Sequence, residues 1–145
     1  MENIRLRKAT SKDRAIVVDF DYSLDKDEHI KLHRIEKITK AISNEECFLI
    51  LIDKQEVGFV IFDYRFFDQG RIELIIIDEK YRRKGVGGKT FDIIREQSKS
   101  DKVFTSTNNS TTQMQRALTK ANFTFAGKLY GLDEGGPEVF YYKNI

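Results

Sequence analysis

The sequence contains one cysteine, no tryptophan and no long hydrophobic run. Because Cys47 has no second cysteine to pair with, a disulfide within the chain is excluded and a reducing compartment is indicated. The longest apolar runs, at 48–52 and 74–77, are far shorter than the roughly 20 residues of a membrane-spanning helix. The first residues do not show the charged and then apolar pattern of a secretion signal. We therefore expect a cytoplasmic protein with no membrane partner.

The chain also lacks a strong excess of charge of either sign. Its 25 basic and 23 acidic residues give a formal net charge of +2, and they are spread along the whole chain. This distribution gives no reason to expect a nucleic-acid partner. No repeat, linker or low-complexity tract interrupts the chain, and 145 residues with 40% apolar content suit one core. We expect a single domain over residues 1–145.

Two kinds of hydrophobic pattern alternate along the chain. Short β-branched and aromatic runs predict strands at 4–8, 47–53, 57–62, 72–77, 102–107, 123–130 and 138–142. Apolar residues spaced by three or four predict helices at 11–20, 25–42, 85–97 and 110–122. We expect Ser11 to cap the first helix, and Leu32, Ile35, Ile38 and Ile42 to share the inner face of the second, amphipathic helix. The order β-α-α-β-β-β-α-β-α-β-β predicts an α/β fold with a mixed sheet flanked by helices.

Three glycines lie where the strand at 72–77 gives way to a helix. Gly85, Gly87 and Gly88 precede or form the first helical turn, whose amide N–H groups have no acceptor inside the helix. Glycine allows a ligand to approach the backbone, and a helix N-terminus favours an anion such as phosphate. The basic residues Arg82, Arg83, Lys84 and Lys89 add positive charge. Alternatively, the glycines only turn the chain and the basic residues are solvated.

Two phosphate-binding motifs compete at this junction. Gly88, Lys89 and Thr90 match the end of the P-loop motif G-x-x-x-x-G-K-[ST], but Arg83 stands where its first glycine belongs. The other motif is R-x-x-G-x-G, formed by Arg82, Gly85 and Gly87 within "DEKYRRKGVG". This motif, in this order of strands and helices, resembles the acyl-CoA signature of the GCN5-related N-acetyltransferase (GNAT) superfamily. The resemblance extends over nearly the whole chain.

The resemblance implies an acetyltransferase that takes acetyl-CoA as its acyl donor. In that family the backbone of one strand pairs with the pantetheine arm, and the amides of the following loop hold the pyrophosphate. Transferred to this sequence, the cofactor-binding residues are Ile75, Ile76, Ile77, Arg82, Arg83, Lys84, Gly85, Val86, Gly87, Gly88 and Asn108. Asn108 is expected near the pantetheine or adenosine portion. For Arg82, a surface ion pair with Asp78 or Glu79 is the alternative.

The catalytic residues are less clearly marked. Glu73 is our candidate general base because it stands alone among apolar neighbours in "IELIII"; the alternative is an ion pair with Arg65 or Arg71. The tyrosine that the family often uses as general acid falls on Leu118, and the Gly-Phe pair that follows it becomes Asn122 and Phe123. Tyr130 is a substitute acid, although an aromatic residue in a strand more often packs.

Other features of the sequence have ordinary explanations. His29 and His33 are spaced like helical metal ligands, but no third ligand accompanies them, so we expect surface histidines and no metal. The aromatic stretch "FDYRFF" at 62–67 could shape an acceptor pocket with Asp63 and Asp68, or form core and rim.

We predict an N-acetyltransferase that acetylates a primary amine of a small molecule or peptide. The alternatives are an acyl-CoA-binding sensor or partner domain of the same fold, without turnover, and a P-loop-type nucleotide binder. Dimers are frequent in the family that the chain resembles, so a homodimer is a further expectation.

Overall fold

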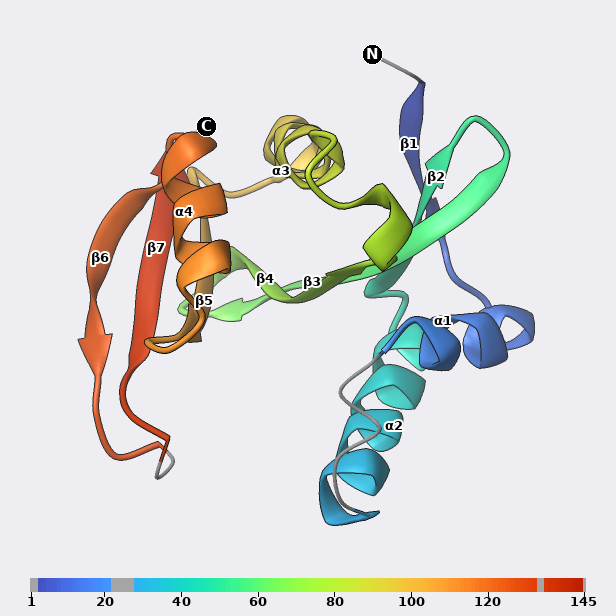
Figure 1. The fold of residues 1–145 in the computed structure, drawn as a ribbon, viewed down its shortest axis with the longest axis horizontal. Coiled ribbons are helices and arrows are strands. Elements are labelled where there is room, and N and C mark those ends of the chain that lie inside the picture. Colours follow the sequence, from blue (N-terminus) through green and yellow to red (C-terminus); the bar gives the residue numbers. More distant parts are fainter. Residues whose placement is uncertain (1–2, 22–27, 133–134, 145) are drawn as a thin grey trace. The chain divides into compact units, whose positions relative to one another are not determined.

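The computed structural model describes residues 3–21, 28–132 and 135–144. Its strands are β1 (Ile4–Lys8), β2 (Cys47–Ile52), β3 (Gln55–Phe66), β4 (Gln69–Ile77), β5 (Lys102–Asn108), β6 (Thr124–Leu129) and β7 (Glu138–Asn144). The α-helices are α1 (Arg14–Phe20), α2 (Glu28–Ser43), α3 (Val86–Gln97) and α4 (Thr112–Lys120). Two short 3-10 helices, η1 (Ser11–Asp13) and η3 (Glu79–Tyr81), precede α1 and α3. The predicted order of strands and helices is confirmed (Figure 1).

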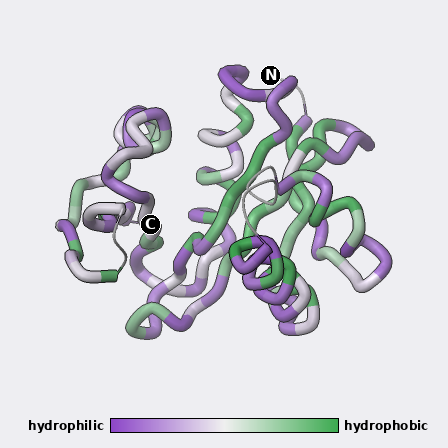
Figure 2. The backbone as a smooth tube through the Cα atoms, turned by 60° about the horizontal axis from the view of Figure 1, so that its bottom comes forward, coloured by the Kyte–Doolittle hydropathy of each residue, from purple (hydrophilic) through white to green (hydrophobic). Residues whose placement is uncertain are grey.

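The strands form one mixed sheet of seven in the order β1-β2-β3-β4-β5-β7-β6. β1 pairs antiparallel with β2, β2 with β3, and β7 with both β5 and β6. β4 and β5 run parallel, because the crossover through α3 returns the chain in the same direction. The predicted α/β fold class is therefore confirmed. In Figure 2 the hydrophobic residues gather on the strands, whereas turns and loops are mostly hydrophilic.

The third and fourth strands are longer than their apolar runs predicted. β3 continues through Asp63 to Phe66, and β4 begins at Gln69. Phe67 and Asp68, which connect the two strands, have φ angles of 53° and 63°. Two consecutive residues with positive φ match a type I′ turn, whose twist suits a hairpin. The stretch "FDYRFF" is thus mainly strand, with its last residue in the turn.

Contacts divide the chain into two compact units that interleave along the sequence. Unit 1 comprises Met1–Phe62 and Leu74–Val86, and unit 2 comprises Asp63–Glu73 and Gly87–Ile145. β3, β4 and α3 each contribute residues to both units, so no linker separates them. The single-domain organisation remains a prediction.

The core of unit 1 lies between its strands and the helices α1 and α2. It contains Val17, Ile38, Ala41, Ile42, Cys47, Leu49, Leu51, Phe59, Ile61 and Ile76. Burial raises the pKa of the Cys47 thiol to about 12, because the thiolate would lose its hydration. Leu32 is 64% exposed, so its predicted place on the inner face of α2 is wrong. The buried residues of α2 all lie in its C-terminal half.

The first helix begins differently from the prediction. Thr10, not Ser11, is the residue before the first turn, and η1 precedes α1. The carboxylate of Asp13 accepts a hydrogen bond from the Thr10 backbone N–H at 2.8 Å. The second helix was predicted to start at Asp25, which lies outside the described residues.

The core of unit 2 lies on the side of its strands that faces α3 and α4. Its buried residues are Ile72, Thr90, Phe91, Ile94, Val103, Thr105, Leu118, Phe123, Val139 and Tyr141. The rings of Phe91 and Phe123 meet edge to face with centroids 5.3 Å apart. Among the described residues, no helix is long and apolar enough to cross a membrane.

Candidate functional site

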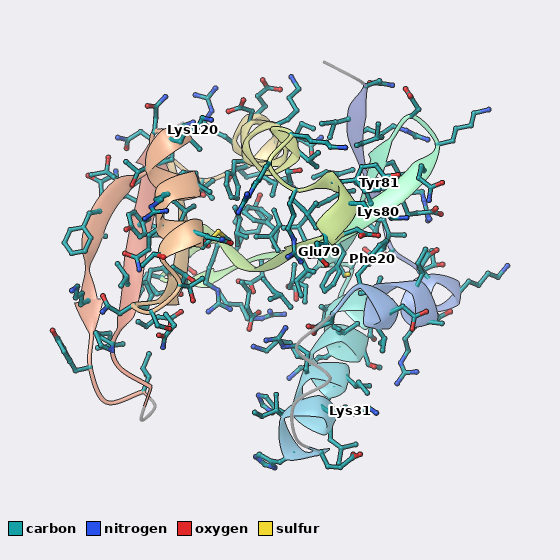
Figure 3. The ribbon with its side chains drawn as sticks, in the orientation of Figure 1. Phe20, Lys31, Glu79, Lys80, Tyr81 and Lys120 are labelled. Atoms are coloured by element: carbon teal, nitrogen blue, oxygen red, sulfur yellow. The ribbon has the colours of Figure 1, made fainter. Side chains whose placement is uncertain are left out.

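The chain leaves β4 through a tightly bonded turn. The Asp78 N–H donates to the Val57 carbonyl at 2.8 Å, and the Asp78 carboxylate accepts from the Lys80 N–H at 3.1 Å. This caps η3, whose residues Glu79, Lys80 and Tyr81 are labelled in Figure 3. Arg82 Nε then donates to the carbonyl oxygen of Ile77 at 2.8 Å. Arg82 thus ties the loop back to the end of the strand that leads into it.

The loop from Arg82 to Gly85 has an unusual backbone. Arg83 has a φ of 60° and Gly85 a φ of 82°, and α3 begins at the next residue, Val86. A positive φ in a non-glycine residue costs roughly 1–2 kcal/mol, and such strain clusters at functional sites. Successive amides in alternating left- and right-handed conformations form concave anion sites. The side chains of Arg83 and Lys84 are exposed beside this turn.

The first turn of α3 contains a glycine, Gly88, that packing against neighbouring residues does not require. A methyl group added at Gly88 would meet nothing within 4 Å among the described residues outside its own helix. Glycine in a helix is less favourable than alanine by about 1 kcal/mol. Since packing does not explain this cost at Gly88, close approach of a ligand is the physical reason that fits. The backbone of 85–88 therefore fits an anionic group such as the CoA pyrophosphate.

The C-terminal half of β4 has a distinct environment. The ladder between β4 and β5 joins Gly70, Arg71 and Ile72 to residues 103–105, and Ile75, Ile76 and Ile77 lie beyond it. On the β3 side, a Cβ added at Gly58 would lie against the Ile76 carbonyl oxygen and 2.9 Å from Ile77 Cα. The Ile77 N–H points away from Gly58, because the C=O and N–H of a trans peptide point in opposite directions. Backbone groups of this segment suit the pairing with an extended amide chain that the family resemblance implies.

Glu73 lies in a network of charges in unit 2. Arg71 Nη2 is 3.2 Å from Glu73 Oε2 and 3.0 Å from Asp63 Oδ2. The Asp63 side chain is fully buried, and its Oδ1 accepts from the Arg65 N–H at 2.9 Å. The alternative of an ion pair between Glu73 and Arg71 is thus confirmed as a contact. The Glu73 side chain is still 25% exposed, so the contact is compatible with proton transfer.

The structure places the other predicted site residues in unit 2. Asn108 ends β5, and its Oδ1 accepts from the N–H and the hydroxyl of Ser110 at 2.9 and 2.7 Å. This turn fixes the side chain of Asn108 at the start of the loop before α4. Tyr130 follows β6 and is 72% exposed.

A search of curated proteins found no match. A family model described as "Acetyltransferase (GNAT) family" matches residues 14–123, about three quarters of the chain. The chain belongs to the GNAT acetyltransferase family.

Solved GNAT structures have the same fold as this GNAT chain. A GNAT family acetyltransferase from Bacillus cereus is 29% identical, with a TM-score of 0.78 and coverage of 98% of this chain and 97% of that one. A GNAT family acetyltransferase from Streptococcus agalactiae is 15% identical, with a TM-score of 0.79 over 98% and 95% of the two chains. A putative streptothricin acetyltransferase from Bacillus anthracis, solved with acetyl coenzyme A, is 19% identical, with a TM-score of 0.62 over 68% and 62%. The match to the GNAT family favours the acyl-CoA motif over the P-loop alternative.

The position of the frequent GNAT tyrosine has a structural role here. Leu118, which stands at that position, is fully buried on α4. The N–H groups of Asn122 and Phe123 donate to the carbonyls of Thr119 and Leu118 at 3.0 and 2.9 Å, which closes α4 as a Schellman motif. Asn122 has a φ of 67°, and asparagine adopts this left-handed conformation more readily than most residues. The family's glycine is thus replaced by the next most suitable residue.

Sequence reasoning did not identify two features of this site. It did not predict that Asp63 is buried and bridged by Arg71, because the signal, an aspartate within an aromatic strand, also suits a surface turn. The role of Gly58 was also not predicted, although a lone glycine inside a strand pattern indicates close approach of another backbone.

Proposed function

We propose that this protein transfers the acetyl group of acetyl-CoA to a primary amine. The observation that carries the proposal is the loop of Arg82–Gly85 with its two left-handed residues, directly followed by the glycine-rich start of α3. Membership of the GNAT family supports the donor, and so does the neighbour from Bacillus anthracis that was solved with acetyl coenzyme A.

In the proposed reaction the bound thioester supplies the acetyl group. An alkyl ammonium first loses a proton, for which Glu73 is the proposed acceptor or the first member of a relay to solvent. A bond then forms between the amine nitrogen and the acetyl carbon, and the bond between that carbon and the CoA sulfur breaks. The nitrogen releases its second proton, and the CoA thiolate binds one. The products are an N-acetylamine, CoA with a free thiol, and one proton.

A second candidate function is acyl-CoA binding without turnover. It is favoured by the full burial of Leu118, which leaves no tyrosine at the position where GNAT enzymes often hold their general acid. Tyr130 stays a candidate for that role, but a CoA thiolate can also leave without a dedicated acid, because its pKa is near that of a free thiol.

One experiment distinguishes the two functions. The purified protein is incubated with acetyl-CoA and a panel of primary amines, and both the free thiol and the acetylated amine are measured. Equal amounts of thiol and N-acetylamine confirm the transferase. Binding of acetyl-CoA without either product contradicts it and supports the binding domain. Thiol release without acetylated amine indicates hydrolysis and also contradicts the proposal.

A further inference from the structure

Four aromatic rings lie together on one face of the unit 2 strands. The centroid of Phe66 is 5.1 Å from that of Phe104 and 5.7 Å from that of Phe140, and Phe104 is 5.7 Å from Tyr142. Phe104 stands opposite Tyr142, and Ser106 opposite Phe140, so these side chains share one face of the sheet. We call Phe66, Phe104, Phe140 and Tyr142 the aromatic face.

The helices of unit 2 pack on the other face of the same strands. Val103, Val139 and Tyr141, which alternate with the aromatic face, are buried. The Tyr141 hydroxyl bonds to Gln115 of α4, and Lys143 Nζ donates to the Ala121 carbonyl that follows α4; Figure 1 shows α4 alongside β5 and β7. The core of unit 2 is thus built on the opposite face. All four rings of the aromatic face are only partly buried.

Charged groups lie on the same side of the sheet as these rings. Arg71 stands opposite Phe104 in the parallel ladder, so Arg71, and Glu73 two residues later, share its face. Asp63 reaches this side as well, because its carboxylate contacts Arg71 at 3.0 Å. Glu138 Oε2 accepts from the Ser106 hydroxyl at 2.8 Å. Lys102 shares this face too, because it alternates with Phe104 along β5, although it stands opposite Asn144 at the far end of the strand. The carboxylates of Asp63, Glu73 and Glu138 are thus balanced by Arg65, Arg71 and Lys102.

We propose that the aromatic face binds the acceptor, and that the acceptor is a primary amine carried on an aromatic ring. This inference rests on the proposed function and names the substrate class of its amine site. The ring of the acceptor packs on Phe104 and Tyr142, with the offset or edge-to-face geometry that aromatic pairs prefer. Its ammonium group lies toward the carboxylate of Glu73, which is the proposed proton acceptor. An acceptor with a carboxylate beside its amine would bring that carboxylate next to Glu73 and is therefore disfavoured.

The first experiment compares three acceptors at saturating acetyl-CoA. These are 2-phenylethylamine, ethylamine, which lacks the ring, and L-phenylalanine, which adds a carboxylate. We expect kcat/KM for 2-phenylethylamine to exceed that for ethylamine by about tenfold or more, as burial of a ring against aromatic side chains implies. We expect L-phenylalanine to be about tenfold worse than 2-phenylethylamine. Equal kcat/KM for 2-phenylethylamine and ethylamine would overturn the inference and leave the transferase intact.

Two variants test whether the acceptor binds on the aromatic face. Tyr142→Leu removes a ring from the aromatic face but keeps an apolar side chain, and Phe104→Leu is its alternative should the first variant fold poorly. Phe125→Leu is the matched control, because Phe125 is 55% exposed and contacts Tyr141 on the opposite face. We expect the first two to raise KM for 2-phenylethylamine about fivefold or more, with a smaller effect on KM for ethylamine and with KM for acetyl-CoA unchanged. Equal effects of all three variants would overturn the inference.

Failure of the proposed function gives a different result. If no amine is acetylated although acetyl-CoA binds, the transferase proposal fails. Calorimetric titration of the CoA-bound protein with 2-phenylethylamine and with ethylamine then tests whether the aromatic face binds an aromatic amine. Tighter binding of 2-phenylethylamine, lost in Tyr142→Leu, supports an aromatic-amine site. Equal binding of the two amines overturns it.

Discussion

Arginine side chains hold three aspartates of this chain in place. Arg7 forms two hydrogen bonds to Asp13 at 3.0 and 3.1 Å, and Arg34 contacts the buried Asp21 at 2.9 Å. Arg71 contacts the buried Asp63 at 3.0 Å. In each pair the arginine comes from a different segment, so the fork-shaped guanidinium joins two parts of the chain. Removing either partner leaves the other charge partly desolvated, so these pairs affect stability more than exposed ion pairs do.

The Asp13 pair predicts a dependence of stability on pH. The bonds from Arg7 and from the Thr10 N–H lower the pKa of Asp13 from 3.8 to about 2 in the folded protein. The charged Asp13 carboxylate therefore contributes fully to the free energy of unfolding above pH 3.8, and this contribution is lost as the pH falls through about 2. Because the Arg7 side chain is 37% exposed and its charge is screened by water, we expect the pair to stabilise the folded protein by only on the order of 1 kcal/mol.

Urea unfolding of Asp13→Asn at a series of pH values checks this expectation. The variant should be less stable than the wild type near neutral pH, and the difference should shrink between about pH 4 and pH 2. Asp19→Asn, an exposed change on α1, is the control and should leave the free energy of unfolding nearly unchanged at each pH. A difference that stays constant down to pH 2 would contradict the role of the carboxylate charge.

Glu73 provides the second prediction at this scale. If its carboxylate accepts the ammonium proton, Glu73→Gln should lower kcat at neutral pH by about a hundredfold, because general base catalysis contributes that much or more. The dissociation constant for acetyl-CoA should change little. Glu79→Gln, in η3, is the matched control for loss of a carboxylate. An unaltered rate with a good acceptor would return Glu73 to a structural role, as in its ion pair with Arg71.

At the scale of single elements, two glycines serve different purposes. Gly58 of β3 allows β4 to approach, since an added Cβ would meet the backbone of Ile76 and Ile77. Gly88 of α3 faces open space. Side chains of a helix tilt toward its N-terminus, so a methyl at position 88 would project toward the proposed anion site.

Replacing each glycine with alanine separates these roles. Gly88→Ala should stabilise the unliganded protein by about 0.5–1 kcal/mol, because alanine favours the helix, while weakening acetyl-CoA binding about tenfold or more. Gly58→Ala should destabilise it by about 2 kcal/mol or more, because backbone cannot move aside cheaply. Urea unfolding and calorimetric titration measure both effects. Unchanged affinity in Gly88→Ala would remove the pyrophosphate assignment.

The patterns of single elements predicted most of the fold but not its irregular places. The order of strands and helices followed from period-two and period-3.6 patterns, which depend only on which face is buried. The continuation of β3 through Asp63 did not follow, because a buried aspartate becomes favourable only when Arg71 of another strand supplies its partner. Likewise, the motif "RRKGVG" predicted the anion loop, but the left-handed Arg83 depends on a backbone conformation that the letters do not show.

On the scale of the whole molecule, the backbone groups proposed to hold the donor lie in one continuous stretch of the chain, from Ile75 to Gly88. The strand residues Ile75–Ile77 and the loop Arg82–Gly85 belong to unit 1, whereas Gly87 and Gly88 begin unit 2. β4 and α3, the two elements that carry these residues, are themselves divided between the units. A ligand bound by this stretch only in its native conformation should stabilise the folded protein.

Thermal unfolding with ligands checks this linkage. A ligand bound only by the native state, at about 100 times its dissociation constant, adds about 2.7 kcal/mol of stability, which raises Tm by roughly 8 °C for a chain of this size. We expect this rise with acetyl-CoA and with CoA, because the two share the pyrophosphate and pantetheine groups. Mg-ATP lacks the pantetheine arm and should raise Tm far less. A rise with Mg-ATP equal to that with CoA would mean that the loop binds phosphates without β4. No rise with either CoA ligand would contradict the donor site.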